Sequence, residues 1–104
     1  HQPADILYRA DRLVYGQGTD SDPVEVVRRM REYIEAHLAG GGRLHQITRH
    51  MMGLFAASPG ARQWRRILSE GASRPGADYG LVEQALDAVL EARVQAQAAM
   101  IQPV

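Results

Sequence analysis

The 104-residue chain contains no cysteine and no lysine, and only six of its residues are aromatic: one tryptophan, one phenylalanine and four tyrosines. Without cysteine there is no disulfide framework, no thiolate metal site and no cysteine nucleophile. No apolar run approaches the roughly 18–20 residues needed to cross a bilayer, so we expect no membrane partner. We expect a cytoplasmic protein, although a chain without cysteine fits other compartments too. The chain opens with His1-Gln2-Pro3 rather than methionine. We therefore expect it to be a piece of a larger protein.

The basic residues are unevenly distributed. All twelve are arginines, a bias that a genome rich in G and C explains without any appeal to nucleic acid. Their placement says more. Residues 43–74 hold six arginines against one acid, a net charge of +5, whereas residues 1–42 carry −2 and residues 75–104 carry −3. A chain with a formal net charge of zero thus has one strongly positive segment, which indicates a surface for an anionic partner.

Apolar residues recur with helical period throughout, and no segment alternates as a half-buried strand does. The predicted fold is all-α, a small antiparallel bundle of four main helices preceded by an N-terminal helix. The start and stop signals are Asp22-Pro23, the glycines at 40–42, Ser58-Pro59-Gly60 and Asp78. They place the helices at about 3–14, 23–39, 44–57, 59–70 and 79–98.

The inward-facing residues of the four main helices follow from the same period. The predicted core comprises Val27, Met30, Ile34, Leu38, Leu44, Ile47, Met51, Leu54, Phe55, Ala61, Trp64, Ile67, Leu68, Val82, Ala85, Leu86, Val89 and Leu90. Met51-Met52 are interpreted as core filler, and Trp64 and Phe55 as core residues rather than platforms for stacking bases.

The sequence offers little for catalysis. It contains no nucleophile elbow, no phosphate-binding glycine loop of the Walker type and no carboxylate cluster in an apolar setting. His45 and His50 do not have the i, i+4 spacing of a zinc-binding helix, and no second ligand pair accompanies them. We expect no catalytic, metal-binding or cofactor-binding residue in this chain.

Arginines cluster on one side of the predicted helix over 59–70. Arg62, Arg65 and Arg66 share a face, and only Glu70 is near to relieve their mutual repulsion. Guanidinium groups match phosphate oxygens bidentately, so this face is predicted to bind phosphate. A merely solvated face and an acidic protein partner are the alternatives. Arg43, Arg49 and His50 belong to the same positive segment, although Arg49 would alternatively pair with Glu70.

Two stretches resemble a known family. Residues 44–55 (LHQITRHMMGLF) and 59–70 (PGARQWRRILSE) resemble the end of the tRNA-dihydrouridine synthase A family, whose tail has the form HITRHMLGLF…PGARxWRRxLSE. The likeness extends more sparsely over nearly the whole chain. The departures are Met52 in place of leucine, the sequence of residues 56–58, and an Ala/Gln-rich tail; none of them touches an arginine.

The resemblance implies a parent enzyme of two domains. A flavin-binding (β/α)8 barrel would precede this chain and would reduce a D-loop uridine of tRNA with FMN and NADPH, using a cysteine that lies outside the chain. Residues 1–18 would be the end of that barrel and a linker, and residues 19–104 a helical tRNA-recognition domain. The implied partners are tRNA, through Arg43, Arg49, His50, Arg62, Arg65 and Arg66, and the barrel in cis. A homodimer through the orphaned N-terminal helix is a further expectation.

Two other functions are compatible with the residues themselves. A helical protein–protein interaction module would dock its arginines on an acidic partner or on the parent barrel. A helix-turn-helix DNA reader would use the helices over 44–57 and 59–70, but Gln63 alone is thin support for base recognition.

Overall fold

A computed structural model describes residues 22–101. This range contains helices α2 (Pro23–Arg29), α3 (Arg31–Ala39), α4 (His45–Thr48), α5 (Ala61–Gly71) and α6 (Tyr79–Ile101), and no strand. The predicted all-α bundle is thereby confirmed. The expected helix over 3–14, the dimer that it would mediate and the boundary at residue 18 lie outside the described residues.

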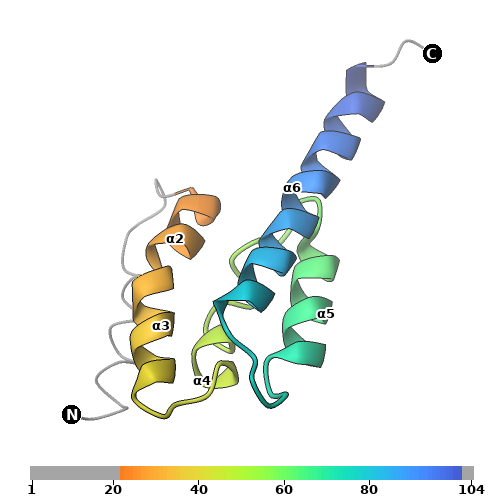
Figure 1. The fold of residues 1–104 in the computed structure, drawn as a ribbon. Coiled ribbons are helices and arrows are strands. Elements are labelled where there is room, and N and C mark those ends of the chain that lie inside the picture. Colours follow the sequence, from red (N-terminus) through yellow and green to blue (C-terminus); the bar gives the residue numbers. More distant parts are fainter. Residues whose placement is uncertain (1–21, 102–104) are drawn as a thin grey trace.

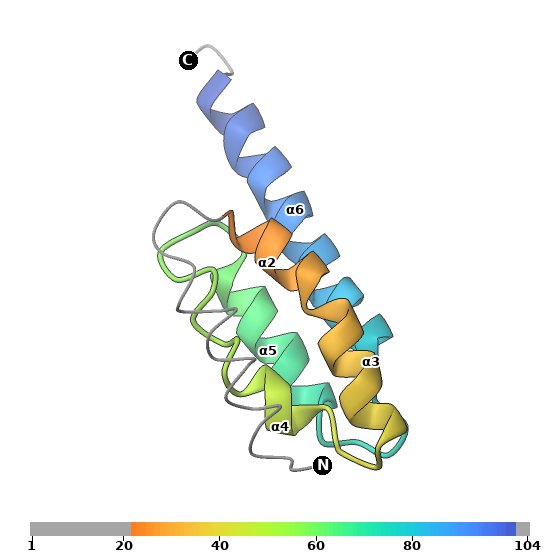
Figure 2. The same cartoon turned by 90° about the vertical axis from the view of Figure 1, so that its left-hand side faces the viewer.

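The long helix α6 organises the bundle. Figures 1 and 2 show α5 running antiparallel to α6, with α2 and α3 beside its first half and the second half projecting past the other helices. On the projecting part, Val94 is 62% and Met100 is 85% exposed. Within residues 22–101, no helix combines the length and the apolarity that a bilayer crossing requires.

Two of the predicted helix starts are confirmed by their caps. The Asp22 carboxylate accepts a hydrogen bond from the Val24 N–H at 3.1 Å, with Pro23 in the first turn of α2. The Asp78 carboxylate does the same for the Gly80 N–H at 2.9 Å, at the start of α6. Each carboxylate pairs a backbone donor that the first helical turn leaves without a partner.

The single helix predicted over 23–39 is divided at Met30. The Met30 N–H is shared between the Val26 and Val27 carbonyls, at 3.0 and 3.1 Å, so one residue is tightened out of α-helical geometry. The Met30 side chain is fully buried. The prediction was right about the extent of the helical segment and wrong about its continuity.

The helix predicted over 44–57 is wrong beyond Thr48. After α4 the chain continues in turns closed by i to i+3 hydrogen bonds, such as Met51 N–H to the Thr48 carbonyl at 2.8 Å. The Met51 carbonyl accepts the indole N–H of Trp64 at 2.9 Å, which draws this segment onto α5. Gly53 lies within the segment and Ala57 takes a positive φ of 63°, and both disfavour a continuous helix.

The core consists of one apolar cluster. Most of the residues predicted from helical period are buried, while a few predicted ones are half-buried at its edge, namely Leu38, Leu54, Ala61, Ile67 and Leu90. Met51 is fully buried, and Met52 is half-buried against the cluster. The core also holds Tyr79, whose hydroxyl donates to the Val27 carbonyl at 3.3 Å and ties α6 to α2.

The start of α5 packs closely against α6 at Gly60, so we expect a larger residue there to destabilise the fold. Its φ is +89°, and a Cβ there would lie 2.7 Å from the Val89 Cα, a backbone atom that cannot turn aside. Gly76 has a similar φ of +80° but open space around it. We expect Gly60→Ala to lower the free energy of unfolding by about 2 kcal/mol more than Gly76→Ala does. Urea denaturation of both variants measures this difference, and equal losses would show that α5 and α6 do not meet here.

Candidate nucleic-acid interface

Helix α5 separates an apolar face from a cationic one. Trp64 and Leu68 are fully buried, whereas Arg62, Arg65 and Arg66 are exposed. At about 100° per residue, the three arginines fall within an arc of roughly 100° on the side away from Trp64. The predicted grouping of these three side chains on one helix face is therefore present, and we call it the α5 arginine face.

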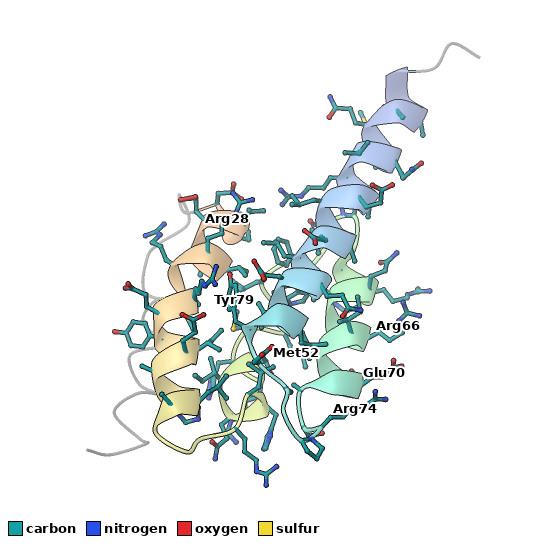
Figure 3. All side chains as sticks on the ribbon, in the orientation of Figure 1. Arg28, Met52, Arg66, Glu70, Arg74 and Tyr79 are labelled. Atoms are coloured by element: carbon teal, nitrogen blue, oxygen red, sulfur yellow. The ribbon has the colours of Figure 1, made fainter. Side chains whose placement is uncertain are left out.

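The α5 arginine face is not neutralised within the part of the chain that the structure describes. The ion pair found there is Arg31 with Glu35 on α3, at 3.1 Å. Figure 3 shows Arg66, Glu70 and Arg74 following one another along the same side of the α5 segment, yet neither arginine reaches Glu70 at ion-pair distance. Ser69 hydrogen-bonds back to the Arg65 carbonyl at 2.6 Å and brings no negative charge.

The remaining predicted RNA-binding residues flank α4. Arg43 precedes this helix with an exposed side chain, and its backbone N–H donates to the Gln46 side-chain oxygen at 2.9 Å. Arg49 follows it, also exposed, and its Nε donates to Nε2 of the half-buried His50 at 3.3 Å. Among the described residues, Arg49 forms no ion pair with Glu70, so the alternative role expected for Arg49 is not observed. Arg49 hydrogen-bonds to the neighbouring His50 instead.

The aromatic pair next to this surface is structural, as predicted. Phe55 and Trp64 are 1% and 0% exposed and meet edge to face, with ring centroids 4.8 Å apart and an interplanar angle of 68°. Neither ring is accessible to a nucleic-acid base. Contact through this surface would therefore depend on charge rather than on stacking.

Sequence reasoning missed two residues beside the arginines. His37 is 3% exposed, and its Nε2 lies 2.8 Å from the Gln46 side-chain oxygen that also accepts the Arg43 N–H. The burial of His37 could have been predicted from its position three residues after Ile34, on the same buried stripe of the helix. Arg74 was counted in the positive segment but not as a binding residue. It lines a hollow together with Arg43, from a loop distant in sequence.

That hollow, about 500 Å³ in volume, does not fit a flavin. None of its lining residues is aromatic, and the Gly41 and Gly42 amides donate to the Leu38 and His37 carbonyls. It thus offers no aromatic platform for the flavin ring, and these two amides are already engaged within the loop. Among residues 22–101, no group of three or more histidines or carboxylates is placed to hold a metal ion.

The helix-turn-helix alternative fails on the structure of the third segment. That motif needs two helices joined by a turn of three or four residues. Here α4 is only four residues long, and a run of turns from residue 49 to residue 60 separates it from α5.

Comparison with known proteins places the chain in a family. A family model described as dihydrouridine synthase matches residues 10–93. The tRNA-dihydrouridine(20/20a) synthase of Salmonella typhimurium is 53% identical over 94 residues, which cover 89% of this chain and 28% of that protein. The protein of the same name from Escherichia coli K12 is 52% identical, covering 89% of this chain and 27% of that protein. The Vibrio cholerae protein is 47% identical over 85 residues, covering 78% and 25%.

No solved structure matches the chain. The chain spans about a quarter of the length of the curated relatives it matches. The family match nevertheless runs from residue 10 to residue 93, through every helix that lines the candidate interface. The chain belongs to the dihydrouridine synthase family.

Proposed function

We propose that this chain is the tRNA-binding part of a tRNA-dihydrouridine synthase and holds tRNA phosphates on the α5 arginine face. The observation that carries the proposal is the exposure of Arg62, Arg65 and Arg66 on one side of α5, with no carboxylate of residues 22–101 at ion-pair distance. Like charges so close together repel one another in the free protein. A phosphate backbone relieves that repulsion and accepts bidentate hydrogen bonds from guanidinium groups.

Arg43, Arg49 and His50 would extend the contact along α4. Helical RNA is recognised mostly through its shape and backbone rather than its base edges. A surface made of arginines beside a fully buried tryptophan suits that mode of binding. The chain would therefore position tRNA without selecting a base sequence.

The chemistry would occur outside these 104 residues. The relatives named tRNA-dihydrouridine(20/20a) synthases are more than three times as long as the stretch they share with this chain. In the parent, a flavin-binding barrel in cis would reduce a D-loop uridine, and FMN recharged by NADPH would supply the hydride. This chain's own residues would bind and orient the tRNA. The cytosol is the compartment in which a protein with this role meets its substrate.

The salt dependence of tRNA binding tests the proposal. If about four phosphates are neutralised, the logarithm of affinity should fall with the logarithm of salt concentration at a slope of roughly −3 to −4. Fluorescence anisotropy of a labelled tRNA, titrated with the 104-residue chain at several salt concentrations, gives the slope. Binding that is absent at low salt, or indifferent to salt, contradicts the phosphate-binding role.

A protein–protein role is the second candidate. Val94 and Met100 are exposed on the projecting part of α6, and a contact with another protein at that end of the molecule would cover them. In this reading the α5 arginine face would dock on an acidic partner or on the parent barrel. Arginine variants that keep full tRNA affinity and lose association with the barrel would support it over the first.

A further inference from the structure

Two loops that are far apart in sequence form a cationic hollow at one end of the bundle. Gly41 and Arg43, between α3 and α4, line one wall, and Arg74 and Gly76, between α5 and α6, line the other. Both arginines are exposed. The hollow has a volume of about 500 Å³, room for a phosphate group with its water. We call it the loop cleft.

The first wall is held in place by internal hydrogen bonds. The Gly42 N–H donates to the His37 carbonyl at 2.9 Å and the Gly41 N–H to the Leu38 carbonyl at 3.0 Å, the pattern that closes a helix with a left-handed residue. Below it, the Gln46 oxygen joins the His37 ring to the Arg43 N–H. A Cβ on Gly42 would overlap the His37 ring, so the loop is packed directly on that buried side chain. Arg43 therefore projects from a fixed backbone.

The second wall is a tight loop as well. The Arg74 N–H donates to the Gly71 carbonyl and the Ala77 N–H to the Arg74 carbonyl, both at 3.1 Å. Asp78 is the acid that lines the cleft, and its carboxylate is engaged in capping α6 through the Gly80 N–H. Neither Arg43 nor Arg74 forms an ion pair with any residue that the structure describes. Within this part of the chain, the cleft thus presents two guanidinium groups that no ion pair neutralises.

We infer that the loop cleft binds a phosphate of the same tRNA backbone, with Arg74 as an RNA contact in addition to Arg43. The inference rests on the proposed function. The inference extends the proposed RNA-binding surface beyond α5, because Figure 3 shows Arg74 continuing the line of Arg66 and Glu70 along the α5 segment. A strand that runs from Arg66 in this direction would pass Glu70 and reach Arg74 at the edge of the cleft. Arg74 then joins the α5 arginine face to Arg43, which otherwise lies apart from it.

Single and double glutamine variants of the two cleft arginines test the inference. We expect Arg43→Gln and Arg74→Gln each to weaken tRNA binding about three- to tenfold, and each to reduce the salt slope by roughly 1. Arg29→Gln is the matched control, because Arg29 is also exposed and unpaired in the described range but lies on α2. The control should leave affinity within about twofold of the unaltered chain.

The outcomes separate this inference from the proposed function. If charge reversal on α5 weakens tRNA binding while Arg43→Gln and Arg74→Gln match Arg29→Gln, the cleft is not an RNA contact and the α5 proposal stands. If the unaltered chain binds no tRNA, both fail.

A second arm uses inorganic phosphate, followed by the amide resonances of Gly41 and Gly76. Weak phosphate binding that is lost in the double variant, together with weakened tRNA binding, supports the inference. If the double variant loses phosphate binding but binds tRNA as tightly as the unaltered chain, the cleft is a site for a free anion, and the inference is overturned.

Discussion

We expect the double variant Arg62→Glu/Arg66→Glu to bind tRNA at least about a hundredfold more weakly than the unaltered chain at moderate salt. Two of the three cations of the α5 arginine face become anions, so phosphate attraction turns into repulsion over the same surface. Both side chains are exposed, and neither forms an ion pair within the described residues. The fold should therefore tolerate the change. Titrating labelled tRNA at constant ionic strength measures the loss.

Arg28→Glu/Arg29→Glu is the control with the same change in net charge. These two arginines are also exposed, but they lie on α2. Reversal here should weaken tRNA binding by only a few-fold, through the long-range field of the protein. Circular dichroism of both double variants verifies that the helices remain. Equal losses in the two would mean that net charge alone governs binding and that the α5 arginine face has no special role.

Replacing Trp64 with alanine should cost about 3–5 kcal/mol of stability, a large part of what a domain of this size possesses. The side chain is fully buried, packs edge to face on Phe55, and donates its indole N–H to the Met51 carbonyl at 2.9 Å. Its loss leaves a cavity between α5 and the turns that follow α4. Chemical denaturation followed by circular dichroism measures the change in the free energy of unfolding.

Trp64→Phe keeps an aromatic ring, although a smaller one, and removes the hydrogen bond, so it remains informative if the alanine variant does not fold. The Met51 carbonyl still accepts the Leu54 N–H at 3.2 Å, so it is not left without a partner. We expect a loss of about 1–2 kcal/mol. A Trp64→Ala variant as stable as the unaltered chain would place Trp64 outside the core, available to stack on a base.

The helix limits set by local chemistry were predictable. Asp22 and Asp78 cap the helices that their positions before apolar-periodic segments indicate. The buried stripes follow because a helix facing one core repeats its apolar residues every three or four positions. Trp64 and Phe55 were assigned to the core for this reason, and both are buried.

Features that depend on distant partners were not predictable. The segment after Thr48 has a helical apolar pattern, but the Trp64 indole, thirteen residues away from Met51, draws it into turns. Gly53 is a local signal against a continuous helix after Thr48, whereas the division of the second helix at Met30 has no such signal, since residues 25–35 contain neither proline nor glycine. The helical repeat of apolar residues identifies which side chains point inward. Whether the helix runs without a break depends on what those side chains pack against.

The candidate site shows the same division. Spacing alone placed Arg62, Arg65 and Arg66 on one face, because all three lie on a single helix. The loop cleft joins Arg43 to Arg74 through the return of the chain along α5, and no local pattern connects them. The family resemblance noted in the sequence is confirmed by the match over residues 10–93. The RNA-binding role of the individual arginines stays a prediction.

Arginine side-chain Nε–H resonances, recorded while unmodified tRNA is added to isotopically labelled protein, would locate the bound RNA most directly. Arg62, Arg65 and Arg66 should show the largest changes, and Arg28 and Arg29 on α2 little or none. Changes confined to α2, or none on α5 at saturating tRNA, would contradict the assignment of this helix as the surface that holds the nucleic acid.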